Sequence, residues 1–217
     1  MKAVYWARDY AYAAGRQLSH AVRRPDTSRH ARGAAAPVLL LPGVWETWQF
    51  LKPVAQRLSA LGHPIHVVDE LGRNSGQVRQ MADVVARYLE KHDLSAVRVV
   101  AHSKGGLIGK HLMLGASGAR ISRMTAIATP FAGSAYANYL PGPTLRAFRP
   151  TDETILRLGK DRAANGRIVS IYPRFDPHIP GGSFLAGARN IELPLAGHFR
   201  ILKHPRLIHA VVSTLTD

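Results

Sequence analysis

VRVVAHSKGG, the sequence of residues 97–106, decides the fold of this chain. Its β-branched apolar residues predict a buried strand over Val97–Ala101, and an apolar helical pattern follows the turn after it. A serine placed in so sharp a strand-to-helix turn projects its hydroxyl above the sheet. The small residues Ala101 and Gly105 on either side allow the backbone to fold back closely. We therefore interpret Ser103 as a nucleophile rather than as a simple helix cap.

Strand and helix patterns alternate along the chain on both sides of this stretch. We expect further strands at residues 38–41, 65–68, 124–128, 168–172 and 190–193. We expect helices at residues 53–60, from a Ser75 cap to about residue 91, and at 205–215. Short apolar strands that alternate with helices are typical of a parallel sheet covered on both faces. The sequence thus predicts the α/β class, with about six mostly parallel strands that bind ligands at their carboxyl ends.

Residues 1–36 differ in character from the rest of the chain. Aromatic residues near the N-terminus are compatible with a short helix, and the stretch from residue 23 to 36 contains Pro25 and Gly33, which is typical of a linker. We expect an N-terminal arm and linker over residues 1–36 and one domain over residues 37–217. Arg8 and Asp9 interrupt the first apolar stretch, whereas a secretory signal peptide has about 7–15 unbroken apolar residues. We therefore expect a cytoplasmic protein.

The chain is strongly basic and contains no cysteine. Its formal net charge is +15 at pH 7. The absence of cysteine excludes disulfide bonds, thiolate catalysis and cysteine metal sites. Nucleic acid is not an expected partner, because the basic residues are scattered and show neither a dense run with interleaved aromatics nor zinc-finger spacing. A solvated basic surface explains the charge, and weak association with an anionic membrane surface is the alternative.

Five stretches of the chain resemble, in order, the motifs of the α/β-hydrolase superfamily, and in particular those of small lid-less bacterial lipases and esterases. They are LLPGV at residues 40–44, AHSKGG at 101–106, ATPFAGS at 128–134, DPHIP at 176–180 and AGHF at 196–199. The resemblance covers residues 37–217 and implies a compact α/β-hydrolase fold with a minimal cap. The chain departs from the usual pattern by having Ala101 in place of glycine and Lys104 in place of a neutral residue.

The resemblance implies a Ser–acid–His triad in that order along the chain. His198 follows the last expected strand and is the expected base, while His204 and His209 are assigned to surface or packing positions. Asp176 lies just past the expected strand at residues 168–172 and is the expected acid, which orients the histidine and stabilises its charged form. Two weaker candidate acids precede that strand, Asp152 and Asp161. Asp69 and Glu70 are left out, because they resemble a structural turn of the family.

The oxyanion hole is expected to use two backbone N–H groups, those of Val44 and Lys104. The Lys104 side chain is interpreted as solvated, with pairing to Glu46 or to an acidic substrate as alternatives. Trp45 and Trp48 are candidates for walls of the acyl pocket, with packing against the core as the equally weighted alternative. The resemblance implies no metal and no cofactor.

The sequence therefore predicts a serine hydrolase that cleaves carboxylic esters through an acyl-enzyme, with a small ester or lipid as substrate. An acyltransferase or thioesterase on the same triad is the alternative within enzymes, and a catalytically silent binding module is the alternative outside them. We expect short to medium acyl chains, because Pro141, Pro143 and Pro150 break helices in the segment from 134 to 166. A lid helix there would begin only near Thr151 and would be short.

Overall fold

The computed structural model describes residues 2–22 and 33–216. Six strands form one sheet in the order β2-β1-β3-β4-β5-β6, and every neighbouring pair is parallel. The strands are β1 (Val38–Leu41), β2 (Ile65–Val67), β3 (Val97–His102), β4 (Ile121–Ile127), β5 (Ile168–Phe175) and β6 (Arg189–Ala196). The predicted α/β class with about six parallel strands is confirmed.

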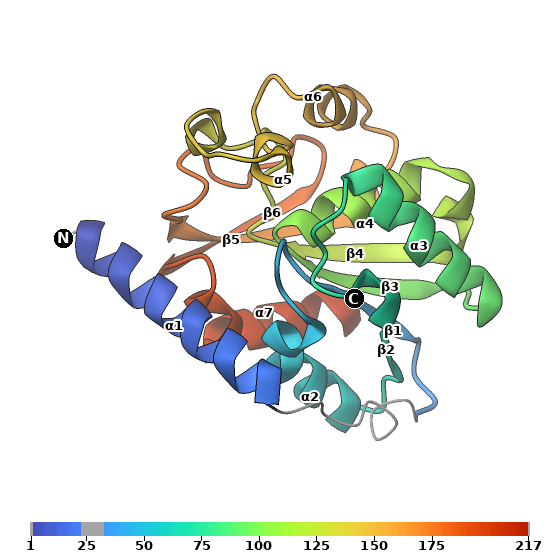
Figure 1. Ribbon diagram of the computed structural model, residues 1–217. Coiled ribbons are helices and arrows are strands. Elements are labelled where there is room, and N and C mark those ends of the chain that lie inside the picture. Colours follow the sequence, from blue (N-terminus) through green and yellow to red (C-terminus); the bar gives the residue numbers. More distant parts are fainter. Residues whose placement is uncertain (1, 23–32, 217) are drawn as a thin grey trace.

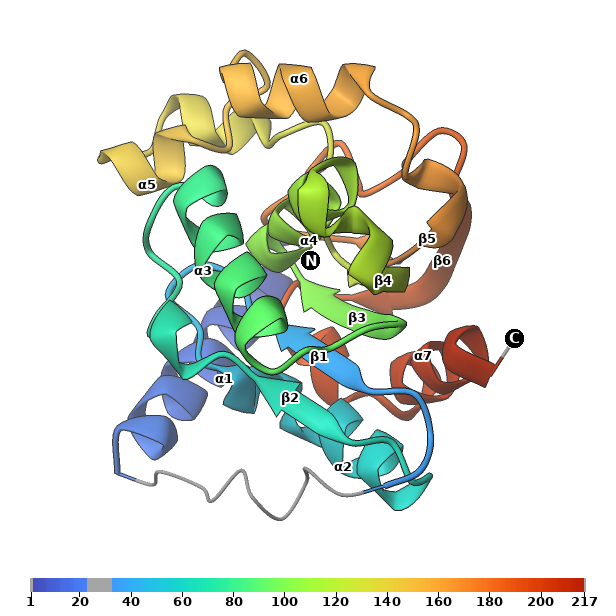
Figure 2. The ribbon, with the colours of Figure 1, turned by 90° about the vertical axis from the view of Figure 1, so that its right-hand side faces the viewer.

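Helices cover both faces of this sheet. The helices are α1 (Lys2–Val22), α2 (Lys52–Ala60), α3 (Val78–Lys91), α4 (Lys104–Leu114), α5 (Pro143–Arg146), α6 (Glu153–Lys160) and α7 (Pro205–Thr216). Figure 1 shows α3 and α4 on one face and α1, α2 and α7 on the other, and the view in Figure 2 agrees. The sheet is therefore the middle layer of three.

Strand β1, which lies between β2 and β3, shows why the strands are continuously apolar. All four of its side chains are fully buried. Leu39 and Leu41 belong to the core on the α3–α4 face, while Val38 and Leu40 belong to the core on the α2–α7 face. Since successive side chains of a strand point to opposite faces, a strand between two helix layers needs apolar residues at every position.

Two local predictions about helices are wrong. α3 begins at Val78 and not after a Ser75 cap, because Gln77 and Gln80 form a reciprocal capping box in which each side chain accepts a backbone N–H of the other residue. α1 has 21 residues and is no short helix. It packs on the α2–α7 face, where Ala13 joins the core and Arg16 Nη2 donates to the carbonyl oxygen of Gln49 over 2.5 Å.

The division into an arm over residues 1–36 and a domain over 37–217 stays a prediction. Most of the expected linker, residues 23–32, lies outside the described residues. Within the described residues, no helix combines the length and the apolar character that crossing a membrane requires.

The cap is small, as predicted. The chain between β4 and β5 contains α5, which is a single turn, and α6, which has eight residues. α6 begins at Glu153, just after the predicted point near Thr151. In Figure 1, α5 lies above the carboxyl ends of the strands, and α6 lies above α4. This segment roofs the end of the sheet at which ligands are expected.

Candidate active site

Ser103 lies in a strained turn between β3 and α4. Its backbone has φ 51° and ψ −120°, a region that residues other than glycine rarely adopt. The turn packs against β1, because a Cβ atom at Gly105 would lie 2.1 Å from the carbonyl oxygen of Leu41. A Cβ atom at Gly106 would likewise lie 2.0 Å from Oγ1 of Thr129. The glycines are therefore required by neighbouring strands as well as by the turn itself.

Asp176 and His198 form a buried hydrogen-bonded pair at the ends of β5 and β6. Nδ1 of His198 lies 2.8 Å from Oδ2 of Asp176. The other carboxylate oxygen, Oδ1, accepts the backbone N–H groups of His178 over 2.8 Å and Ile179 over 3.1 Å. Both carboxylate oxygens of Asp176 are therefore engaged, and Nε2 is the ring nitrogen of His198 that does not face Asp176.

The pKa values of this pair move in opposite directions. Burial raises the pKa of Asp176, but the charge and hydrogen bond of His198 and the N–H of His178 outweigh it and hold that pKa below its ordinary value. Burial lowers the pKa of His198, but Asp176, followed by the charges of Glu46 and Asp9, raises it above its ordinary value. The pair is therefore suited to an ionised acid that stabilises a protonated histidine.

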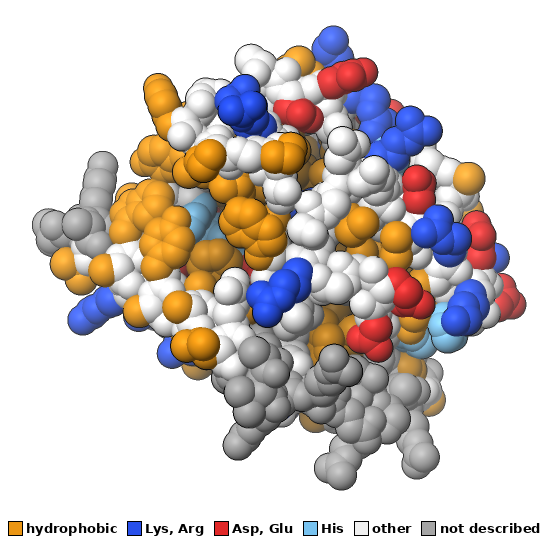
Figure 3. Space-filling model, in the orientation of Figure 1, with side chains coloured by type: hydrophobic (Ala, Val, Ile, Leu, Met, Phe, Trp, Pro, Cys, Tyr) orange, Lys and Arg blue, Asp and Glu red, His pale blue; other side chains and the backbone are white. Residues whose placement is uncertain are grey.

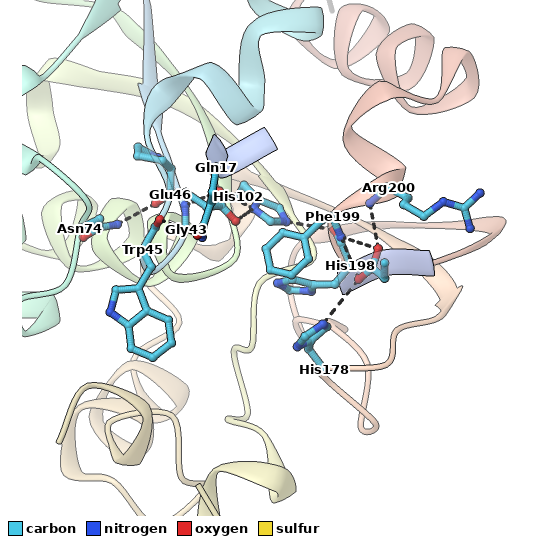
Figure 4. Close-up of polar contacts among 12 residues, drawn as sticks. Gln17, Gly43, Trp45, Glu46, Asn74, His102, His178, His198, Phe199 and Arg200 are labelled. Atoms are coloured by element: carbon cyan, nitrogen blue, oxygen red, sulfur yellow. Dashed lines mark hydrogen bonds and ion pairs between the residues drawn. The ribbon is translucent and has the colours of Figure 1, made fainter. Parts of the chain in front are cut away.

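The backbone of His198 is held as firmly as its ring. Its N–H donates to Oδ2 of Asp9 over 2.9 Å, and its carbonyl oxygen lies 3.1 Å from Nε2 of His102. Nδ1 of His102 lies 2.9 Å from the Glu46 carboxylate, and both residues are buried. Figure 4 shows this row of contacts from the loop after β1 to the loop after β6.

The two residues whose backbone N–H groups are predicted for the oxyanion hole are near Ser103 either in the pocket or in the sequence. Val44 lines the same pocket as Ser103, and Lys104 is the first residue of α4, where backbone N–H groups are free to bind an anion. The loop that carries Val44 is fixed, because the N–H of Gly43 donates to Oε2 of Glu46 over 2.9 Å.

The interpretation of the Lys104 side chain as solvated is wrong, and so is its pairing with Glu46. The side chain is buried, and its Nζ donates to the carbonyl oxygen of Asn74 over 2.7 Å and to that of Gly76. Asn74 in turn donates to the carbonyl oxygen of Pro42 over 2.7 Å. Burial lowers the pKa of Lys104 to about 8. The lysine side chain connects the turn at Ser103 to neighbouring loops, and it does not line the pocket.

An apolar pocket of about 260 Å³ opens above Ser103 and His198. Its walls are mostly aromatic and aliphatic side chains from α1, the cap and the loops: Trp6, Tyr10, Val44, Pro130, Tyr136, Ala137, Tyr139, Leu140, Leu145, Phe148, Ile179 and Phe199. Figure 3 shows hydrophobic side chains gathered around a hollow in which histidine is visible. A pocket of this kind suits the apolar part of a small substrate.

Comparison by sequence finds no matching family model and no matching curated protein. Comparison of structures finds many similar folds. An esterase (EaEST) from Exiguobacterium antarcticum superposes with a TM-score of 0.61 at 16% identity, over 85% of this chain and 93% of that one. The enol-lactonase from Burkholderia xenovorans gives a TM-score of 0.59 at 17% identity, over 85% and 93%. A structure from the work on LipS and LipT, two metagenome-derived lipolytic enzymes, gives a TM-score of 0.59 at 15% identity, over 86% of this chain and 95% of that one. The chain has the α/β-hydrolase fold.

On this α/β-hydrolase fold, Asp176 is the candidate acid that contacts His198, and Ser103 and His198 line the same pocket, whereas the rival carboxylates bond elsewhere. Asp152 caps α6 by accepting the N–H of Thr154, and Asp161 accepts the N–H of Ala163. Neither lines the pocket, and the same is true of Asp69, Glu70, His204 and His209. Within the described residues, no group of three or more His, Asp or Glu side chains is arranged to hold a metal ion.

Sequence reasoning missed the contribution of α1 to the α/β-hydrolase site. Trp6 and Tyr10, one turn apart on that helix, line the pocket. The two candidate tryptophans do not, because Trp48 packs in the core and Trp45 is largely exposed. One sequence signal could have indicated this contribution. Asp9 lies between Trp6 and Tyr10 in an apolar stretch, and a single acidic side chain there needs a hydrogen-bonding partner if the helix packs against the domain.

Proposed function

We propose that the chain is a serine hydrolase that cleaves carboxylic esters with Ser103 as nucleophile. The observation that carries the proposal is that His198, which is paired with Asp176, lines the same apolar pocket as Ser103, a serine on a strained strand-to-helix turn. A serine hydroxyl is a weak nucleophile until a histidine accepts its proton. Solved structures with the same fold include proteins named as an esterase, an enol-lactonase and lipolytic enzymes, which supports ester chemistry.

The proposed reaction has two halves. In the first, Oγ of Ser103 attacks the ester carbonyl carbon while Nε2 of His198 takes the hydroxyl proton. The tetrahedral oxyanion is stabilised by the backbone N–H groups of Val44 and Lys104. The carbon–oxygen bond to the alcohol then breaks, His198 returns the proton to that oxygen, and an acyl-enzyme remains. In the second half, water attacks the acyl carbon with the same proton transfers and releases the acid.

A labelling experiment tests the nucleophile. A fluorophosphonate that reacts with activated serines is added to the wild-type protein, to Ser103→Ala and to Ser134→Ala, and the modified peptide is identified by mass spectrometry. Ser134 is a matched control, because it lines the same pocket but its hydroxyl donates to the carbonyl oxygen of His178 over 2.6 Å. We expect label on Ser103 in the wild type and in Ser134→Ala, and none in Ser103→Ala.

Turnover of p-nitrophenyl butyrate is measured on the same three proteins. Removal of a triad member costs several orders of magnitude in kcat, so Ser103→Ala is expected to lose its activity while its circular dichroism spectrum is kept. Wild-type turnover by Ser103→Ala, or a label that remains in that variant, would contradict the proposal.

A further inference from the structure

Helix α1 places a single acidic side chain against the loop that carries His198. Asp9 is fully buried and is the only acidic residue of the helix. Its Oδ2 accepts the backbone N–H of His198 over 2.9 Å. Its Oδ1 accepts the backbone N–H groups of Phe199 over 3.1 Å and Arg200 over 2.9 Å. Three consecutive N–H groups of the histidine loop therefore converge on one carboxylate from the other end of the sequence.

The histidine loop is shaped to admit this carboxylate. Gly197 has φ +113°, and a Cβ atom there would lie only 2.8 Å from Oδ1 of Asp9. On the opposite side, Nε2 of His178 lies 3.5 Å from Oδ2 of Asp9. The ring of His178 is itself 4.9 Å from that of His198, measured between centroids. Asp9 thus contacts both loops that form the Asp176–His198 pair.

A buried carboxylate is a costly anchor if its only task is to attach a helix. Its desolvation disfavours folding unless hydrogen bonds and charge repay it, and an apolar residue would attach α1 without that cost. A carboxylate supplies two things that an apolar residue lacks: two acceptor oxygens for three backbone N–H groups, and a negative charge close to the His198 ring.

We infer that Asp9 is a positioning residue for His198. It fixes the backbone of the histidine loop so that the ring stays directed at Ser103, and its charge favours the protonated ring that forms during the reaction. This inference rests on the proposed ester hydrolysis. It makes α1 a part of the active site, since the same helix also supplies two walls of the pocket.

The charge of Asp9 acts within a defined group of neighbours. Five titratable groups face His198, and they come from four parts of the fold: Asp9 on α1, Glu46 after β1, His102 at the end of β3, and Asp176 and His178 in the loop after β5. Of these, Asp176, Glu46 and Asp9 each raise the pKa of His198. Replacement of Asp9 by asparagine removes one of three favourable charges and leaves the other two.

The test compares three substitutions, Asp9→Asn, Asp9→Glu and Arg16→Ala, each made in the wild type and in Ser103→Ala. Arg16 is the matched control, because it ties α1 to the carbonyl oxygen of Gln49, away from the histidine loop. In the active background, kcat and KM for p-nitrophenyl butyrate are measured from pH 5 to 9 and are normalised to active sites titrated with a fluorophosphonate. In the Ser103→Ala background, the His198 ring is titrated by NMR, which needs no activity.

We expect Asp9→Asn to lower kcat per active site about 100-fold, because displacement of a catalytic group by about 1 Å has an effect of that order. KM is expected to change less than about threefold, since the pocket walls are kept. The acid limb of kcat/KM and the NMR midpoint of His198 should both move to lower pH, because a charge that raises the pKa of His198 is gone. Arg16→Ala is expected to keep the wild-type kcat per active site and both midpoints.

Asp9→Glu keeps the negative charge but moves the carboxylate. It also provides a second test of the inference if Asp9→Asn does not fold. We expect it to keep the His198 midpoint and to lose kcat. The inference is overturned if Asp9→Asn retains the wild-type kcat and midpoints, if Arg16→Ala reproduces the changes of Asp9→Asn, or if Asp9→Glu has the wild-type kcat. Failure of the proposed function looks different: the wild type would then neither cleave esters nor take up the phosphonate, while the NMR titration in Ser103→Ala would still report on Asp9.

Discussion

Nε2 of His102 lies 3.1 Å from the backbone carbonyl oxygen of His198. His102 immediately precedes Ser103, so the residue next to the proposed nucleophile holds the loop of the proposed base. Because Glu46 contacts the other ring nitrogen and also accepts the N–H of Gly43, the contact extends to the loop that carries Val44. The proposed nucleophile, the proposed base and the loop of Val44 are therefore joined by two buried side chains, which fixes their separations.

The Glu46–His102 pair should show strong energetic coupling. Both side chains are almost completely buried, and removal of one partner leaves the other without its hydrogen bond. We expect Glu46→Ala and His102→Ala each to lower the free energy of unfolding by about 3–5 kcal/mol. The double variant should lose less than the sum, with a coupling of about 0.5–3 kcal/mol in a urea-unfolding cycle. Simple additivity would mean that the contact contributes little.

Asp176→Asn should be far more damaging to catalysis than the same change at the two rival carboxylates. We expect kcat to fall about 10⁴-fold, because asparagine cannot hold the histidine in its working tautomer. Asp152→Asn and Asp161→Asn serve as matched controls, since each carboxylate accepts only a local backbone N–H and asparagine is an equally good cap. Steady-state kinetics of the three proteins decide the matter, and equal losses would show that the acid lies elsewhere.

Activity should rise with pH through a midpoint above the ordinary histidine value of about 6.5. The reason is that Asp176, Glu46 and Asp9 raise the pKa of His198, while only the neutral ring can accept the serine proton. The measurement is the acid limb of kcat/KM for a p-nitrophenyl ester, whose leaving group is read at a pH-independent wavelength. A limb well below pH 6.5 would contradict the direction of this shift.

Esters of short to medium acyl chains should be the better substrates. The pocket of about 260 Å³ is smaller than the roughly 300–1,000 Å³ of pockets that hold drug-sized ligands. We expect kcat/KM to be higher for C4 and C8 esters than for C16. Trp6→Ala should shift the preference toward longer chains by opening the α1 wall. Tyr5→Ala is the control, because Tyr5 packs against Phe175 and does not line the pocket. A maximum at C16 in the wild type would show that the pocket is misjudged.

The sheet could be predicted from the sequence, and Ser103, Asp176 and His198 could be proposed as the site from it, because the signals for both are local. The strand before Ser103 and the glycines after Lys104 lie in one continuous stretch of sequence. Asp176 directly follows β5, and His198 follows β6 after a single glycine. Parallel strands bring their carboxyl ends to one edge, so residues at those ends meet wherever they lie along the chain. Local pattern and topology are together sufficient for such residues.

The features that the sequence did not predict depend on contacts between distant segments. The Lys104 side chain can be buried because carbonyl oxygens in the loop after β2 accept its hydrogen bonds. No sequence pattern around the lysine predicts these contacts. Trp6 and Asp9 belong to a helix whose docking partner is the loop after β6. The Arg8–Asp9 interruption was used only to argue against a signal peptide, although the same aspartate is fully buried in the folded protein.

Asp9 and His198 are 189 residues apart in sequence, and their contact closes almost the full length of the described chain. Synthesis on the ribosome delivers α1 before the histidine loop, and a contact of this range requires a large loop to close. A nascent chain therefore contains the segment of Ser103 before it contains either His198 or the N–H groups that bind Asp9. If the proposed function holds, such an incomplete chain has no base with which to activate its serine.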